Sequence, residues 1–253
     1  YITSDGDIES DYEDLSDENM DMYNLGNYFQ TKEEVLAFLD KFDEKLYVKV
    51  GMELFYSAGN QTVAYLKEAG KKVFLDLKLH DIPNTVEKSI AALTELGVDL
   101  ITVHASGGRA MMEAAVRGAT MTAEKLKINR PKILAVTILT SFDEKGWEEV
   151  GGKTPIKQQV LHLAQLAKGA GVDGVVASPQ EAKSIRQVCG ETFEIVTPGI
   201  RPAFAQVNDQ KRIATPAQAL SDGASRLVIG RPITKAENPQ MAVQCILEEI
   251  RGN

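Results

Sequence analysis

The sequence predicts an α/β protein, and within that class a (β/α)8 TIM barrel, from three observations. From Thr31 onward, segments with apolar residues at helical spacing alternate with short, continuous apolar runs. Continuous apolar strands separated by helices are typical of a parallel sheet covered on both faces. The length of 253 residues suits one large barrel. The alternative is an open doubly wound sheet, but the glycine-rich fingerprint of such sheets is absent after the first strand.

The short apolar runs are the expected strands. They span residues 47–52, 73–79, 100–105, 133–139, 174–178, 194–200 and 226–233. A closed barrel needs an eighth strand before the first helix, and the only candidate is "MYNLGNYF" at 22–29. This candidate is weak because glycine and asparagine are depleted in strands. We therefore expect a barrel with an atypical or replaced first strand.

The segments between the strands are the expected helices. They span residues 31–42, 57–69, 84–97, 108–125, 154–169, 178–188, 215–222 and 238–251. Apolar residues recur at spacings of three and four within them, as in Val160, Leu163 and Leu166. Several of the segments end at a glycine, which is typical of a helix C-terminus.

Acidic residues are concentrated at the N-terminus. The chain has a net charge of −8, and residues 1–31 alone carry −9 with no lysine or arginine. Residues 32–253 therefore carry 28 basic and 27 acidic side chains. The nearly neutral main part lacks the clustered positive charge that nucleic-acid binding requires. Residues 1–22 are expected to form a flexible or foreign acidic arm, and residues 23–253 a single barrel domain.

The remaining composition indicates a cytoplasmic protein without a membrane anchor. The two cysteines, Cys189 and Cys245, are far apart and predict neither a disulfide framework nor a metal site. No apolar run approaches the ~20 residues that cross a bilayer, and no secretory leader is visible.

The run "VFLDLKLHDIP" at 73–83 carries charges inside an otherwise apolar strand. Side chains alternate along a strand, so Asp76 and Lys78 share one face, which looks into the barrel. Lys49 on the neighbouring strand can join them, and Asp81 follows the C-terminal end of the strand, where barrel active sites are built. Buried charges must be paired. The pattern predicts an active site, although a purely structural ion-pair network is the alternative.

Two later strands end with glycine and arginine, in "TPGIR" at 197–201 and "VIGRPI" at 228–233. In TIM barrels, the loops after strands seven and eight commonly hold a phosphate. Backbone N–H groups and a bidentate arginine suit that ligand. His80 and His104 lack a partner motif, and we interpret both as structural.

Several motifs together resemble the bacterial type of the orotidine 5′-phosphate decarboxylase family. "FLDLKLHDIPNTV" carries the Asp-x-Lys-x-x-Asp-Ile signature of this family. Further blocks resemble it in order: "VKVGMELFY", "VDLITVHASGG", "VTILTS", "VTPGIR", "NDQKRIATP" and "IGRPITKA". The resemblance runs from about Thr31 to the end. The charge pattern alone also fits related phosphate-binding barrel decarboxylases, and the last motifs favour the orotidylate enzymes.

The resemblance implies decarboxylation of orotidine 5′-monophosphate (OMP) to UMP, in pyrimidine biosynthesis, without metal or organic cofactor, by a homodimer with shared sites. It implies that Lys78 protonates C6 of the pyrimidine, that Asp76 lies beside the substrate carboxylate and that Lys49 holds the ribose. The other residues implied are Asp81, Ile82 and Thr85 across the dimer interface, Thr140 at the pyrimidine, Gln210, Gly230 and Arg231 at the phosphate, and Arg201 on a closing loop over 200–210.

The sequence departs from the family at the first strand, which in relatives ends in Leu-Asp-Phe. Tyr28 stands where the aspartate, a ribose ligand, belongs. We therefore predict reduced substrate affinity. The alternative function is a catalytically weakened barrel that serves as a scaffold or carrier for the acidic segment.

Overall fold

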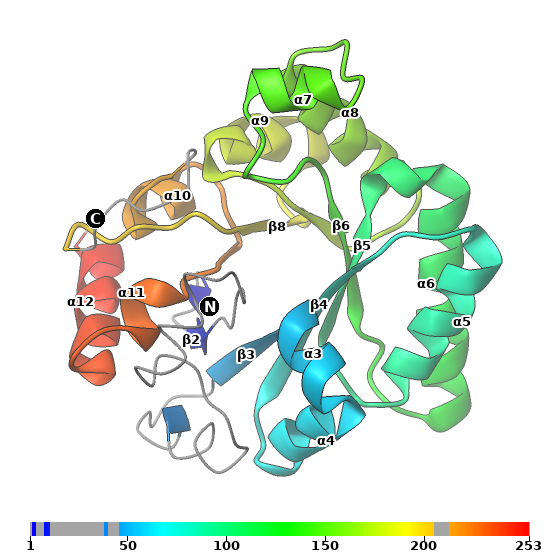
Figure 1. Ribbon diagram of the computed structural model, residues 1–253, viewed down its shortest axis with the longest axis horizontal. Coiled ribbons are helices and arrows are strands. Elements are labelled where there is room, and N and C mark those ends of the chain that lie inside the picture. Colours follow the sequence, from blue (N-terminus) through cyan, green and yellow to red (C-terminus); the bar gives the residue numbers. More distant parts are fainter. Residues whose placement is uncertain (1, 4–7, 11–37, 40–45, 205–212, 253) are drawn as a thin grey trace.

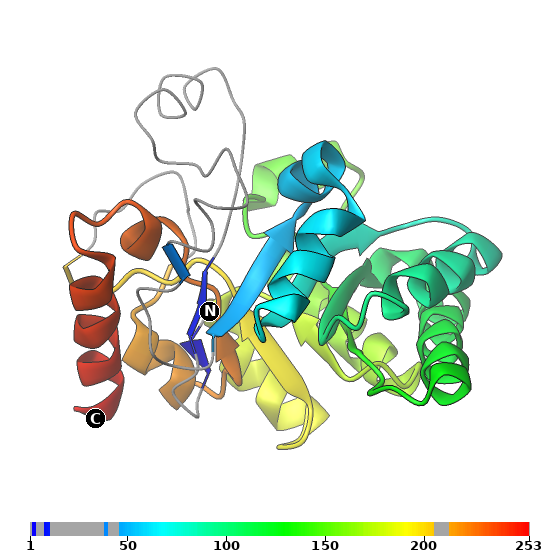
Figure 2. The same ribbon diagram turned by 90° about the horizontal axis from the view of Figure 1, so that it is seen from below.

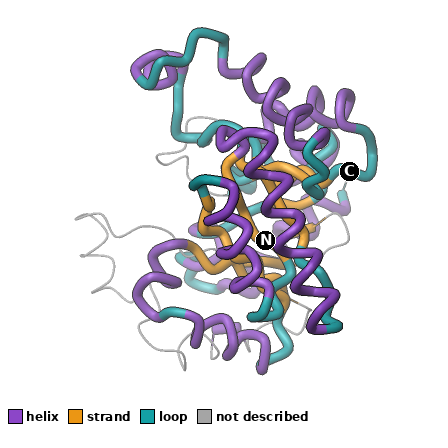
Figure 3. The backbone as a smooth tube through the Cα atoms, turned by 90° about the vertical axis from the view of Figure 1, so that its right-hand side faces the viewer, coloured by secondary structure: helices purple, strands orange, loops and turns teal. Residues whose placement is uncertain are grey.

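A curled sheet of parallel strands forms the centre of the molecule. The computed structural model describes residues 2–3, 8–10, 38–39, 46–204 and 213–252. The strands β3 to β9 follow one another around the sheet in chain order, with helices outside them (Figures 1 and 3). They are β3 (Leu46–Gly51), β4 (Lys72–Leu79), β5 (Leu100–His104), β6 (Lys132–Val136), β7 (Gly174–Val176), β8 (Glu194–Thr197) and β9 (Arg226–Leu227). This order is that of a barrel and not of a doubly wound sheet, in which the order reverses.

The ring is closed between β9 and β3 by two short pieces of the acidic N-terminal segment. The strand β1 (Ile2–Thr3) runs antiparallel to β9, and β2 (Ile8–Ser10) runs parallel to β3. The acidic arm expected at 1–22 therefore contributes two short strands, whereas the expectation that it is flexible or foreign stays a prediction. The rest of the acidic segment and the candidate first strand at 22–29, with Tyr28, lie outside the described residues. The predicted effect of Tyr28 on affinity stays a prediction.

Helices follow most of the strands. They are α3 (Met52–Ala58), α4 (Asn60–Glu68), α5 (Pro83–Thr94), the 3-10 turn η1 (Ala105–Gly107), α6 (Gly108–Leu126), α7 (Glu144–Glu149), α8 (Ile156–Gly169), α9 (Pro179–Cys189), α10 (Pro216–Ser221), α11 (Arg231–Thr234) and α12 (Pro239–Arg251). Seen from below, α12 and the pair α5–α6 cover opposite sides of the sheet (Figure 2). Three helices begin with a side-chain cap followed by proline, at Ser178, Thr215 and Asn238. The cap satisfies a free N–H, and proline suits the first turn because it has none to satisfy.

Some element boundaries differ from those expected. The expected helix 57–69 is two helices, because Gly59 between them has a φ of 65°. The expected strand 226–233 stops at Leu227, and α11 starts at Arg231, since Pro232 in its first turn favours a helix start over a strand. The short helix α7 was not expected. Of the expected helix 31–42, only residues 38–39 are described, and they are helical.

Two separate cores hold the fold together. The larger lies between sheet and helices. The smaller fills the inside of the barrel with one inward side chain from each of five strands and one from the residue just after β9: Tyr47, Phe74, Leu100, Leu134, Val196 and Val228. Inward positions alternate along each strand, so the residues two before and two after this apolar layer face the two ends of the barrel. The layer therefore separates an upper rim, at the carboxyl ends of the strands, from a lower rim.

At the lower rim, the same kind of hydrogen bond joins three pairs of neighbouring strands. The residue just before β5, Asp99, accepts a hydrogen bond from the N–H of Val73 on β4 at 2.8 Å. Asp173, just before β7, accepts one from Ile133 on β6 at 2.7 Å. Ser225 takes the same place before β9 and accepts from Ile195 on β8 at 3.1 Å. These side chains satisfy N–H groups where the strand ladders begin.

Candidate active site

A buried carboxylate between two lysines forms the centre of the upper rim. Oδ2 of Asp76 on β4 lies 2.8 Å from Nζ of Lys78 and 3.5 Å from Nζ of Lys49 on β3. The structure therefore brings together three of the residues that the sequence singled out. Lys49 is 2% exposed, whereas the side chain of Lys78 is 23% exposed. Lys49 is thus fixed inside the protein, and Lys78 is the cation that reaches solvent.

The surroundings of Asp76 keep it ionised. Burial alone would raise the pKa of this carboxyl, but the charges of Lys49 and Lys78 and hydrogen bonds from Lys78 and Thr102 outweigh burial, so its pKa lies below the ordinary value. Lys49 and Asp76 are removed from water, so the opposite charge beside each of them offsets part of the cost of burial. The result is a fixed array of charges in a region of low dielectric, where it acts strongly on a bound substrate.

A bulge in β4 shapes this array. Leu75 pairs with Ile101 and Leu79 with Val103, so three residues of β4 lie opposite Thr102 alone. Within the bulge Lys78 has a φ of 51°, in the left-handed region that costs a side-chain-bearing residue about 1 kcal/mol. Sequence reasoning missed Thr102; the signal for it was a polar residue at an inward position of an apolar strand.

The loop after β4 presents the next expected residues at the surface. Asp81 accepts a hydrogen bond at 2.7 Å from the N–H of Ile82, just before α5 begins. Ile82 is 66% exposed, and Asp81 and Thr85 are also exposed. Within the part of the chain that the structure describes, Asp81 forms no ion pair, so it does not join the array of its own chain.

The expected phosphate residues lie after β8 and β9. Gly230 is the N-cap of α11, and Arg231 is its first residue, half-buried. Arg201 is buried and donates to the carbonyl of Ile200 at 2.9 Å. A bridge joins Ile200, where the loop over 200–210 begins, to Ala214, which follows that loop in the chain. Thr140, after β6, is half-buried. Gln210 lies outside the described residues.

Two histidines lie beside the array. The rings of His80 and His104 are 5.3 Å apart. Burial, together with the neighbouring His80 and Lys78, holds the pKa of His104 below its ordinary value, although Asp76 acts in the opposite direction. His104 is therefore neutral at pH 7, which weakens its claim to a charged role in the site.

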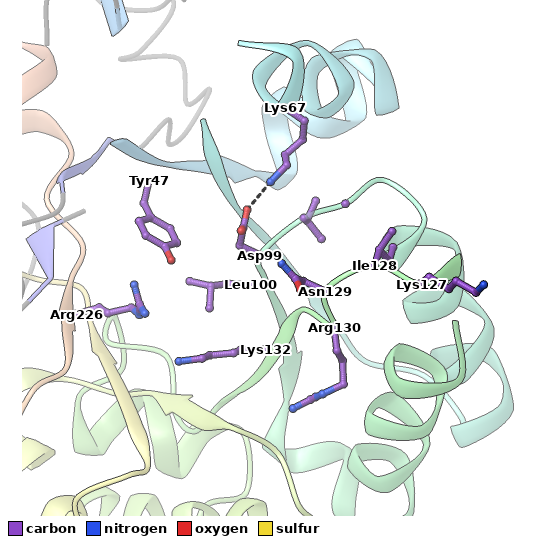
Figure 4. A pocket seen from close by; sticks show the side chains of 12 residues that line it. Tyr47, Lys67, Asp99, Leu100, Lys127, Ile128, Asn129, Arg130, Lys132 and Arg226 are labelled. Atoms are coloured by element: carbon purple, nitrogen blue, oxygen red, sulfur yellow. Dashed lines mark hydrogen bonds and ion pairs between the residues drawn. The ribbon is translucent and has the colours of Figure 1, made fainter. Parts of the chain in front are cut away.

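A cavity of about 580 Å³ opens at the lower rim, away from this array (Figure 4). Tyr47, Lys132 and Arg226 line it, and most of the cations around it pair with carboxylates. Lys67 pairs with Asp99 at 2.8 Å, as the figure shows, Lys132 pairs with Glu194, and Arg130 pairs with Asp173. The lower rim therefore has the character of a structural network.

The described residues contain neither a membrane-spanning helix nor a cluster of metal ligands. No helix among them is long and apolar enough to span a membrane. No group of three or more histidine, cysteine, aspartate or glutamate side chains in the same part of the chain is arranged to hold a metal ion.

A parallel α/β barrel with a lysine–aspartate–lysine array at the carboxyl ends of its strands defines the class: a barrel protein with an enzyme-like site. Comparison with known proteins then identifies the family. Residues 25–246 match the model of the family described as "Orotidine 5′-phosphate decarboxylase / HUMPS family". The chain belongs to this family.

Individual relatives agree with the family match. The orotidine 5′-phosphate decarboxylase of Bacillus cytotoxicus is 50% identical over 226 residues, which cover 88% of this chain and 94% of the relative. The crystal structure of orotidine 5′-phosphate decarboxylase from Lactobacillus acidophilus superposes with a TM-score of 0.77 at 42% identity, over 88% of this chain and 96% of that one. The enzyme of Pyrococcus horikoshii OT3, at 24% identity and a TM-score of 0.67, covers 90% of this chain and 98% of its own and shows the shared fold.

Proposed function

We propose that this protein decarboxylates orotidine 5′-monophosphate to UMP, and that it does so in the cytoplasm. The observation that carries the proposal is the array of Lys49, Asp76 and Lys78 at the carboxyl ends of adjacent strands. Its relatives at about half identity are named for this reaction. Both cysteines are free thiols, as suits a reducing compartment.

The array supplies the electrostatics that the reaction needs. When the bond between C6 and the carboxylate breaks, the electron pair stays on C6, where the ring delocalises it poorly. The ammonium of Lys78 stabilises this negative charge and then gives it a proton. Asp76 lies beside the substrate carboxylate and keeps Lys78 oriented, and Lys49 holds the ribose. Repulsion between the two carboxylates raises the energy of the bound substrate.

The residues after β8 and β9 hold the far end of the substrate. Gly230, Arg231 and Gln210 bind the phosphate, Arg201 acts from the loop over 200–210, and Thr140 contacts the pyrimidine. Because the phosphate does not react, its binding energy can serve loop closure and the exclusion of water from the charged array. Phosphate contacts should therefore affect kcat as well as KM.

The site is completed by a second copy of the chain in a homodimer. Asp81 and its neighbours Ile82 and Thr85 are exposed, and among the described residues Asp81 forms no ion pair with the array of its own chain. An isoleucine that is 66% exposed next to a charged site is the kind of residue that a partner covers. In the dimer, Asp81 of the partner subunit extends the alternation of charges beyond Lys78.

A spectrophotometric assay of orotidine monophosphate loss tests the activity. Lys78→Ala should lower kcat by about 10⁴-fold, the upper range for loss of a general acid. Lys183→Ala, on the exposed face of α9, is the matched control and should keep the activity. If the parent protein keeps the array but shows no loss of orotidine monophosphate in the assay, the result would support the alternative of a barrel that serves as a scaffold.

Subunit mixing tests the shared site. Lys78→Ala and Asp81→Ala chains should each be inactive as homodimers. In a mixed dimer one of the two sites carries both substitutions and the other carries neither, so random mixing should restore about a quarter of the parent activity. Failure of the mixture to gain activity, with mixed dimers confirmed by mass spectrometry, would contradict the sharing of Asp81.

A further inference from the structure

Thr102 is the only residue of β5 opposite the bulge of β4, and it contacts both ends of that bulge. Its hydroxyl donates to Oδ1 of Asp76 at 2.9 Å and accepts from the backbone N–H of Lys78 at 2.8 Å. The side chain is completely buried. A hydroxyl has one proton to give, and Asp76, as an ionised carboxylate, can only accept. The direction of both hydrogen bonds is therefore determined.

The two contacts act on different parts of the array. The bond to Oδ1 fixes the rotation of the Asp76 carboxylate, which leaves Oδ2 to face Lys49 and Lys78. The bond from the Lys78 N–H gives a partner to a backbone group that the bulge removes from the regular ladder. It thereby holds Lys78 in its left-handed conformation, from which the side chain returns to Asp76.

We propose that Thr102 is a positioning residue that sets the orientation of Asp76 and the backbone of Lys78 together. The inference depends on the roles proposed above for these two residues. It goes beyond them because it assigns the shape of the array to a residue that does not itself carry charge. The three groups form a chain from N–H to hydroxyl to carboxylate, in which each hydrogen bond strengthens the next.

A purely structural role for Thr102 makes different predictions. A buried hydroxyl that only satisfies its neighbours would, when removed, lower stability without changing the course of the reaction. A positioning residue would change kcat and its pH dependence, since a small displacement of a catalytic group costs far more in rate than in binding.

The first test is Thr102→Val, which removes the hydroxyl and keeps the branched shape. We expect kcat/KM to fall about 100-fold, mostly in kcat. We also expect the acidic limb of the kcat/KM profile to move to higher pH, because Asp76 loses a hydrogen bond that favours its ionised form. The charged and titratable groups that face Asp76 among the described residues are Lys49, Lys78 and His104, and none of them is altered.

Thr94→Val is the matched control. Thr94 is equally buried, and its hydroxyl donates only to the carbonyl of Ile90 within α5. This variant should lose thermal stability without any change in kcat or pH profile. If Thr102→Val keeps the parent kcat/KM and acidic limb, the proposal is overturned, whatever its melting temperature.

A second pair covers the case in which Thr102→Val does not fold. Thr102→Ser and Thr102→Cys differ in one atom, but a thiol is a weak donor and acceptor. The serine variant should stay within about tenfold of the parent, and the cysteine variant should fall well below it. Equal activities of the pair would overturn the proposal. Asp76→Asn distinguishes a failure of the proposed function from a failure of this inference. If Asp76→Asn stays active, the role proposed for Asp76 is wrong. If Asp76→Asn loses activity and the Thr102 variants do not, only the inference about Thr102 is rejected.

Discussion

The buried lysine of the upper rim lies beside an ionised carboxylate. Lys49 is 2% exposed, and Asp76 lies within 3.5 Å of its Nζ. A lysine removed from water costs several kcal/mol unless a negative charge accompanies it. The pKa of Asp76 lies below the ordinary value because the two lysines and two hydrogen bonds outweigh its burial. Ionised Asp76 therefore stabilises the folded state, and this contribution is present above the unfolded pKa.

We expect Asp76→Asn to lower the free energy of unfolding at pH 7 by about 3 kcal/mol, because Lys49 and Lys78 would lose the negative charge that lies beside them. The deficit should shrink as the pH falls through the lowered pKa of Asp76, where the parent protein loses its own charge. Urea unfolding at pH 7 and at successive steps below 3.8 measures both effects. Asp222→Asn, whose hydrogen bond from Gln218 is exposed, is the control. A deficit that does not change with pH would contradict the assignment.

Residue-level prediction worked where a pattern along one strand carried the information. Alternation placed Asp76 and Lys78 on one side of β4, and the apolar strand before β4 identified Lys49. Thr102 could not be found this way, because its role depends on the bulge that sets three residues of β4 against it. Nor does local sequence show a left-handed Lys78, since lysine has no preference for that conformation.

At the scale of elements, the helix α6 approaches the backbone of α5 closely at Gly118. A β-carbon added there would lie 2.4 Å from the backbone oxygen of Glu87, so α6 can lie against α5 only because this residue has no side chain. Arg117 pairs with Glu87 at 2.8 Å next to the contact. The position of α5 matters for function because the loop before it presents Asp81 and Ile82 to the proposed partner.

We expect Gly118→Ala to destabilise the protein by about 2 kcal/mol, since helix backbone cannot yield as a flexible side chain would. Gly169→Ala is the matched control: it is the same change at the end of α8, where the new carbon meets only the guanidinium of Arg109 at 3.0 Å. Alanine is the better helix former, so this control should be neutral or slightly stabilising. Thermal unfolding of both variants decides the matter, and equal melting temperatures would be inconsistent with the contact.

Helices could be predicted where the helical spacing of apolar residues repeats over several turns, as in α6, α8 and α12. Apolar runs identified all the strands from β3 to β9. Prediction failed where a run of apolar residues continues past the end of a strand. In the segment 226–233 the apolar run continues to Ile229, but the strand pairing ends at Leu227, and Gly230 with Pro232 begins a helix. The helix α7 is too short for a periodic signal.

At the scale of the molecule, an apolar layer separates two charged rims. The inward side chains Lys132, Glu194 and Arg226 form the lower one. Glu194 bonds to Lys132 and lies 3.3 Å from Arg226, so that one carboxylate joins β6, β8 and β9. Lys72 and Arg226 lie over the ring of Tyr47, at 4.5 and 4.8 Å from its centre, which extends the network to β3 and β4.

We expect Glu194→Gln to lower the free energy of unfolding at pH 7 by about 3 kcal/mol without a change in kcat, because it removes the shared partner of two cations far from the array. Burial raises the pKa of Glu194, but Lys132 and Arg226 outweigh it, so the net pKa is lowered. Its contribution is therefore lost as the pH falls through this lowered value. Glu191→Gln, at a side chain 90% exposed, is the control. Loss of kcat in a fully folded variant would show that the rims are coupled.

The barrel as a whole was predictable because alternating strands and helices permit few arrangements. The segments that close the barrel were not predictable. The eighth strand was sought at 22–29, whereas the described backbone between β9 and β3 comes from Ile2–Thr3 and Ile8–Ser10. Short pairings of this kind depend on which long-range neighbours are free, and polar local sequence does not reveal that.

The paired strands described above have a consequence for how the chain could be divided. A cut in the connection 127–129 would keep β4 with β5, β6 with β7 and β8 with β9. It would also leave intact the three hydrogen bonds between a side chain and a backbone N–H that lie at the start of those pairs. The amino-terminal fragment would carry Lys49, Asp76, Lys78 and Thr102, and the carboxyl-terminal fragment Arg201, Gly230 and Arg231. Reaction chemistry and substrate anchoring thus reside in separate halves of one polypeptide, each with its own means of holding its strands in register.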